Sequence, residues 1–125
     1  MQALQKLLTS TGLPFRMVND SLAAIPYGGE NITSYQVVVQ KVGDLYIIYT
    51  NLTEALPGKI DSTRYKYLLQ QNDNFDIVKI GMGIDDNSTM YVRADIYRAG
   101  TTTEMLARII KQVANVTNIV AGDLK

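Results

Sequence analysis

The fold is decided by residues 35–52, which read YQVVVQKVGDLYIIYTNL. Two runs rich in β-branched and aromatic side chains, Tyr35–Val42 and Leu45–Leu52, are separated by Gly43 and Asp44. Such side chains favour strands, and a short glycine-containing pair between two strands favours a tight turn. This stretch therefore predicts a β-hairpin in the middle of the chain.

Working outward from the hairpin, hydrophobic periodicity and turn residues predict the other elements. In order, they are a helix over 1–11, strands over 15–18 and 22–25 joined by a turn at 19–20, a loop over 26–33, the central hairpin, a helix over 63–74 capped by Asp61 or Ser62, strands over 77–84 and 89–97 joined by a turn at 85–87, and a helix from a capping box at Thr101 and Glu104 to about Val116. The tail after Asn118 is expected to be loosely held.

This order of elements predicts the fold class. No connection forces a parallel crossover, so we expect an α+β fold with a largely antiparallel sheet. The sheet would have about five or six strands with three helices, in the order helix, three to four strands, helix, two strands, helix, and residues 1–125 would form a single domain. The predicted core between sheet and last helix comprises Ile80, Met82, Val92, Ala94, Leu106, Ile109 and Ile110.

Composition excludes several kinds of chemistry. The chain has no Cys and no His, so it lacks thiolate and imidazole nucleophiles, bases and metal ligands. We therefore expect no enzyme, no cofactor and no metal. Twelve basic and twelve acidic residues cancel, so net charge gives no reason to expect nucleic acid. The N-terminus lacks a signal-peptide pattern and no apolar run could span a membrane, so we expect a cytoplasmic protein.

Two short motifs allow a functional and a structural interpretation. Asp85, Asp86 and Asn87 could bind a hard cation, but a calcium loop needs a Glu where position 96 is Ile, so a hairpin turn is favoured. Gly81 and Gly83 could suggest a phosphate loop. They lie within a predicted strand that no helix follows, so close approach of another layer is favoured instead.

Tyrosine is the compositional peculiarity, with eight Tyr against two Phe. Strand alternation places four side chains on the face opposite the apolar one: Tyr91, Arg93, Asp95 and Tyr97. Tyr suits surfaces that a partner covers, and it is also common at half-buried strand positions, so both interpretations stay open. We take these residues as a candidate partner or dimer surface, with Tyr65 and Leu69 of the second helix as the other candidate.

A resemblance to a known family starts from residues 67–86, which read YLLQQNDNFDIVKIGMGIDD. A helix that ends in a Leu-Leu-x-x-Asn phrase, a strand that ends in an acidic turn, a further strand and a helix opened by Thr-x-x-Glu resemble the YbjN-like bacterial proteins. They are equally similar to the class I type III secretion chaperones. The resemblance implies a small non-enzymatic cytoplasmic protein, commonly a homodimer, that binds a polypeptide or acts as a regulator. The neutral charge departs from the typically acidic secretion chaperones.

Taken together, the sequence favours a binding module. We expect a chaperone-like or regulatory protein that recognises a polypeptide segment and forms a homodimer, without nucleic-acid or membrane partners. The alternative is a small-ligand sensor or regulatory domain with a pocket between sheet and helices, which a concave apolar cavity would favour.

Overall fold

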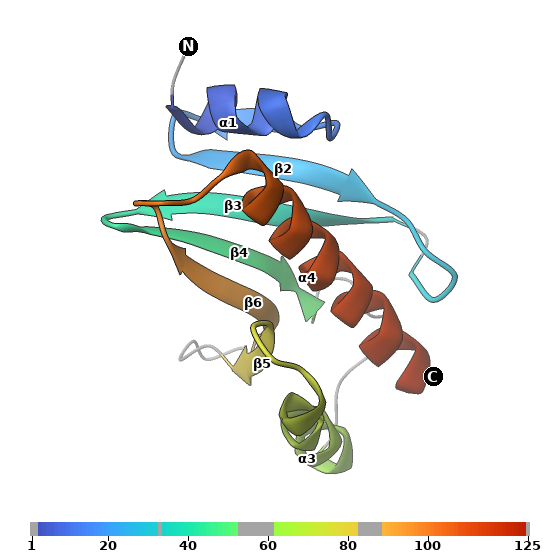
Figure 1. The fold of residues 1–125 in the computed structure, drawn as a ribbon. Helices are drawn as coiled ribbons and strands as arrows, with labels where there is room; N and C mark the ends of the chain where they lie inside the picture. The colour runs from blue at the N-terminus through green and yellow to red at the C-terminus, as the bar shows by residue number, and fades with distance from the viewer. Residues whose placement is uncertain (1–2, 33, 53–61, 83–88, 125) are drawn as a thin grey trace.

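A computed structural model describes residues 3–32, 34–52, 62–82 and 89–124. The elements with described bounds are, in order, α1 (Ala3–Thr11), β1 (Arg16–Asn19), β2 (Leu22–Tyr27), β3 (Tyr35–Val42), β4 (Leu45–Asn51), α3 (Ser62–Gln70), the 3-10 helix η1 (Gln71–Asn74), β5 (Lys79–Met82), β6 (Met90–Tyr97) and α4 (Thr103–Asp123) (Figure 1). The strands form one six-stranded sheet in the order β1-β2-β3-β4-β6-β5, and every neighbouring pair is antiparallel. The predicted α+β class is confirmed.

The central hairpin forms as predicted. Val42 pairs with Leu45, so Gly43 and Asp44 make the two-residue turn. Gly43 has a φ of 56°, a left-handed conformation that glycine adopts without steric cost. Because β4 then pairs with β6, the hairpin supplies the two middle strands of the sheet.

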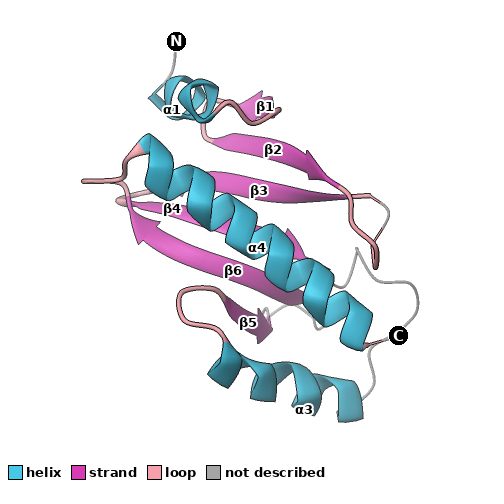
Figure 2. Cartoon of the chain, turned by 45° about the vertical axis from the view of Figure 1, so that its right-hand side comes forward, coloured by secondary structure: helices cyan, strands magenta, loops and turns pink. Residues whose placement is uncertain are grey.

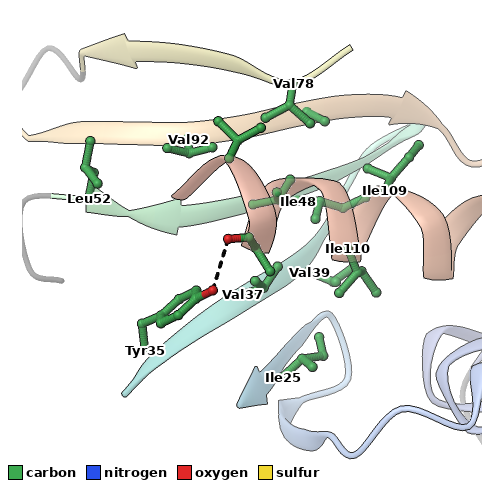
Figure 3. Close-up of a cluster of buried hydrophobic side chains, with 14 of the residues drawn as sticks. Ile25, Tyr35, Val37, Val39, Ile48, Leu52, Val78, Val92, Ile109 and Ile110 are labelled. Carbon is green, nitrogen blue, oxygen red and sulfur yellow. Dashed lines mark hydrogen bonds between the residues drawn. The ribbon is translucent and has the colours of Figure 1, made fainter. Parts of the chain in front are cut away.

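The core lies between the sheet and α4, which crosses one face of the sheet obliquely (Figures 2 and 3). Inward-facing side chains of β2, β3, β4 and β6 meet the apolar stripe of α4 there, and α1 packs against α4 at the β1–β2 side. The residues predicted to share this core are buried, except Met82, which is 45% exposed. Met82 ends the described part of the edge strand β5, whereas α4 packs over β3, β4 and β6.

The last helix differs from the prediction at both ends. Thr102, not Thr101, is its N-cap, because the Thr102 side chain accepts a hydrogen bond from the backbone N–H of Met105. The helix continues to Asp123 rather than ending near Val116. The prediction of a loosely held tail is wrong, because Val120 and Ala121 are fully buried and extend the helix's apolar stripe.

Smaller differences concern strand boundaries. Strand β2 runs through Pro26 to Tyr27, where the neighbouring β1 has already ended, so the missing N–H of proline removes no ladder bond to β1. The first turn lies at residues 20–21, since Asn19 pairs with Leu22. The predicted helix over 63–74 becomes α3 followed by η1, and β5 covers only part of 77–84. The predictions for Asp61, for residues 83–84 and for the turn at 85–87 concern positions outside the described residues.

Candidate interaction surface

One face of the sheet carries no helix among the elements that the structure describes. Helices α1 and α4 pack on the other face, and α3 lies beside the β5 edge (Figures 1 and 2). We call the helix-free side the open face. Because strand side chains alternate and the registers are known, its middle strands present a defined set of residues: Gln36, Val38, Gln40 and Val42 of β3, Leu45, Ile47, Tyr49 and Asn51 of β4, and Tyr91, Arg93, Asp95 and Tyr97 of β6.

The open face is hollowed around two tyrosines. The rings of Tyr49 and Tyr91 meet edge to face, with centroids 5.7 Å apart. A hollow of about 460 Å³ reaches from them toward Gln36 and Val38, and a second of about 190 Å³ reaches toward Ile47. Both hollows include the two tyrosines in their lining, so they are neighbouring depressions on one surface. Beside the tyrosine and aliphatic side chains, this surface carries polar ones, among them Gln36, Gln40 and Asn51.

The structure brings four of the predicted site residues together on the open face of β6. Arg93 donates from Nε to Asp95 Oδ1 at 3.0 Å and from Nη2 to Oδ2 at 2.8 Å, so the two charges form a two-point ion pair within the strand. This hydrogen bonding raises the pKa of Arg93 above its ordinary value. Both side chains are about 40% exposed, so the pair adds little stability. Its charges neutralise each other within the chain.

The two tyrosines of β6 differ in exposure. Tyr91 is half-buried against Tyr49, whereas Tyr97 is 73% exposed at the far end of the strand. Tyr97 stands opposite Leu45, which in turn stands opposite the 45% exposed Val42. This row, Val42–Leu45–Tyr97, forms an uncharged apolar corner of the open face.

The other predicted site residues lie elsewhere. Tyr65 and Leu69 belong to α3, beyond the β5 edge of the sheet (Figure 2). Tyr65 is partly buried against the core, while Leu69 is 50% exposed. These two residues are therefore separate from the β6 group. They also differ from each other, because Tyr65 contacts the core whereas Leu69 is largely exposed to solvent.

Sequence reasoning missed Tyr49 and Val38 as surface residues. Both lie in the central hairpin, whose near-continuous apolar runs hide which face of the sheet is covered. The register with β6 was the missing information, since Tyr49 pairs with Arg93 and Val38 pairs with Tyr49.

A third hollow, away from the open face, lies between α4 and the segment that precedes β5. It has a volume of about 310 Å³ and is lined mainly by apolar side chains, among them Phe75, Val78, Val116 and the half-exposed Ile119. The polar residues Asn74, Asp76, Gln112 and Asn115 complete the lining. This hollow therefore combines an apolar wall with several polar side chains.

Across the described ranges, no three His, Cys, Asp or Glu side chains gather in a group that could hold a metal ion. Within the same ranges, no helix is both long and apolar enough to cross a membrane.

Comparison with known proteins supports the fold. No family model and no curated protein matches the sequence. Three solved structures superpose on nearly the whole chain at low identity. They are a chain of the heterodimeric ExoU–SpcU complex from the type III secretion system of Pseudomonas aeruginosa (TM-score 0.62, 17% identity, 94% of this chain and 93% of that chain), YbjN from E. coli (0.64, 14%, 94% and 85%) and a chain of the ExsC–ExsE complex (0.62, 14%, 95% and 93%). The chain has the type III secretion chaperone-like α+β fold, which YbjN shares.

Proposed function

We propose that this chain is a non-enzymatic, chaperone-like protein-binding module that holds a segment of another polypeptide on the open face. One observation carries the proposal: a sheet face that is free of described helices presents aliphatic and tyrosine side chains around two neighbouring hollows. Patches of this composition on a sheet are typical of surfaces that bind other proteins. Two of the solved structures named above are themselves complexes of two proteins, which agrees with this proposal.

Selection from a phage-displayed library of random peptides tests it. The full-length protein is immobilised, and bound phage are sequenced over successive rounds. We expect a family of related peptides to be enriched, and their binding to require the open face. Failure to enrich any peptide family would contradict the proposal.

Two double variants locate the binding surface. Ile47→Thr with Tyr49→Thr removes apolar surface from the open face and keeps residues that favour strands. Met82→Thr with Met105→Ser is the matched control, because both side chains are more than 40% exposed and neither lies on the open face. A cooperative thermal unfolding transition near the wild-type temperature shows that each variant is folded. We expect only the first pair to abolish peptide binding. Loss in the second pair alone would contradict the open face as the binding surface.

We also propose that the chain forms a homodimer through the apolar corner around Tyr97. Interface centres favour Tyr and disfavour Lys and Glu, and the row Val42–Leu45–Tyr97 has that composition. The surface around Tyr65 and Leu69 is the alternative contact.

We further propose that the protein is located in the cytoplasm. Fractionation of cells that produce the protein tests this location.

One observation favours a second candidate function, that of a small-ligand sensor. The hollow of about 310 Å³ between α4 and residues 74–78 is at the lower end of the range for ligand pockets, and its wall is mainly apolar. Ile119→Trp should fill it. A ligand found by thermal-shift screening that loses its stabilising effect in this variant would support the sensor function.

A further inference from the structure

One row of residues crosses the open face from edge to edge. The registers place in line, strand by strand, Arg16, Ala24, Val38, Tyr49, Arg93 and Lys79. The middle of this row is apolar and aromatic, and it passes both hollows beside Tyr49. We call it the transverse row.

The charges of the transverse row are uneven. Arg93 is neutralised by Asp95, which is the single acidic side chain on the open face among the described strand residues. Arg16 is exposed at the β1 edge. Lys79 at the β5 edge donates its ammonium hydrogens to the backbone carbonyls of Asn72 and Phe75, which are uncharged, so its positive charge is not cancelled. Among the described residues, the row therefore has one cation without an acidic partner at each end, although the whole chain is neutral.

We infer that the open face binds an extended polypeptide segment with an acidic residue at each end and apolar or aromatic residues between them. This inference rests on the proposed function and adds the chemistry of the partner. Complementary charges at the rim of an interface set its register and specificity, while the apolar centre supplies contact area.

The geometry gives the spacing of the acidic residues. Six strands span five inter-strand distances of about 4.8 Å, or about 24 Å from β1 to β5. An extended peptide advances about 3.3 Å per residue, so about seven residues cover that distance. The partner should carry two acidic side chains about seven positions apart.

Other occupants fit the row less well. A single-stranded nucleic acid carries a charge at every nucleotide and needs cations along its path, whereas the middle of this row is apolar and lies beside Asp95. A second copy centred on this row would place a positive face against itself, which costs energy. The dimer contact proposed at Tyr97 lies four residues further along β6 than Arg93, outside the transverse row.

The peptides selected against the full-length protein test the inference. We expect enriched sequences to be net acidic, with two acidic positions about seven apart and apolar residues between. Fluorescence anisotropy then measures one enriched peptide against Arg16→Glu and against Lys6→Glu, an exposed charge reversal on α1 that makes the same change in net charge. Arg16→Glu should weaken binding about fivefold or more, and Lys6→Glu should leave it within twofold.

The outcomes separate this inference from the proposed function. Enriched peptides without acidic bias, or equal binding to Arg16→Glu and wild type, overturn the partner chemistry and leave the protein-binding function standing. Failure to enrich any peptide overturns both. Displacement of the peptide by a single-stranded oligonucleotide of about ten nucleotides at equal concentration assigns the face to nucleic acid and also overturns the inference.

Discussion

The side-chain amide of Asn72 makes two hydrogen bonds with the backbone of Ile80. Its Oδ1 accepts from the Ile80 N–H at 2.6 Å, and its Nδ2 donates to the Ile80 carbonyl at 2.9 Å. Asn72 belongs to η1, and Ile80 is in the edge strand β5. Since these two backbone groups point away from β6, Asn72 occupies hydrogen-bonding positions that another strand would use. Unpaired sheet edges promote association, so this contact closes part of the β5 edge.

Asn72→Ala should open that edge. The backbone N–H and carbonyl of Ile80 would lose their partners, and we expect unfolding free energy to fall by about 1–3 kcal/mol in urea titrations. Sedimentation velocity should also show more association with increasing concentration than for the wild type.

Asn74→Ala is the control for this variant. Asn74 donates to the Gln71 side chain at the exposed surface, so its loss should change stability by less than about 0.5 kcal/mol. Equal effects of the two substitutions would show that the Asn72–Ile80 contact does not protect the edge.

Gly122→Ala tests whether an alanine in the last turn of α4 stabilises or destabilises the protein. Alanine normally stabilises a helix relative to glycine by about 0.5–1 kcal/mol. At position 122, however, a Cβ would overlap the side-chain amide of Asn31, which is held by a 2.9 Å hydrogen bond from Nδ2 to the Asn118 carbonyl. We expect Gly122→Ala to destabilise the protein by about 1–3 kcal/mol in thermal or urea unfolding.

The same substitution should be neutral or stabilising in an Asn31→Ala background, because the obstructing amide is absent there. Additive effects of Gly122→Ala and Asn31→Ala would mean that the loop before β3 does not pack on the end of α4 in this way.

Ile109→Ala tests the packing of α4 on the sheet. Ile109 is 5% exposed, so truncation should leave a cavity and cost about 2–5 kcal/mol of unfolding free energy. Met105, one turn earlier, is 41% exposed, and Met105→Ala should cost much less. A loss well under 1 kcal/mol for Ile109→Ala would exclude a packed position for this part of the helix.

Stability should fall at alkaline pH because of Tyr35. Burial raises the pKa of Tyr35 above 10, with a further contribution from Tyr27, and its hydroxyl donates to the Ala114 carbonyl at 3.0 Å (Figure 3). The protonated form is favoured in the folded state. This contribution is therefore complete below pH 10, and it is lost as the pH rises from 10 through the raised pKa.

Urea unfolding at pH 7 and at several values above pH 10 measures this effect. Tyr35→Phe should cost about 1 kcal/mol at pH 7, and its stability should fall less steeply than that of wild type above pH 10. Parallel slopes for wild type and Tyr35→Phe would contradict the role of Tyr35.

Self-association is checked by sedimentation at micromolar concentration. We expect a dimer. The double variant Tyr91→Ser with Tyr97→Ser should shift it toward monomer, because it removes the exposed ring of Tyr97 from the apolar corner. A wild-type monomer would contradict the homodimer. A dimer that persists in this variant but dissociates in Tyr65→Ser with Leu69→Ser would place the contact on α3.

Local sequence signals were sufficient for much of the fold. The hairpin followed from strand-forming runs around Gly43, and the inward face of β6 followed from the alternation of Met90, Val92 and Ala94, because both patterns depend on residues close in the chain. The C-terminal end of α4 was not predicted, since Val120 and Ala121 are covered by residues distant in the sequence.

The sequence by itself determined the α+β class, the antiparallel hairpins and the absence of thiolate and imidazole chemistry. It also grouped Tyr91 to Tyr97 on one strand face, because the period of a strand is local. Tertiary structure decided which sheet face stays free of described helices, that Tyr49 joins Tyr91 there, and that Arg16 and Lys79 end one row although 62 positions separate them in the chain. Those features depend on strand order and register, which are set by long-range packing of the whole sheet against α4.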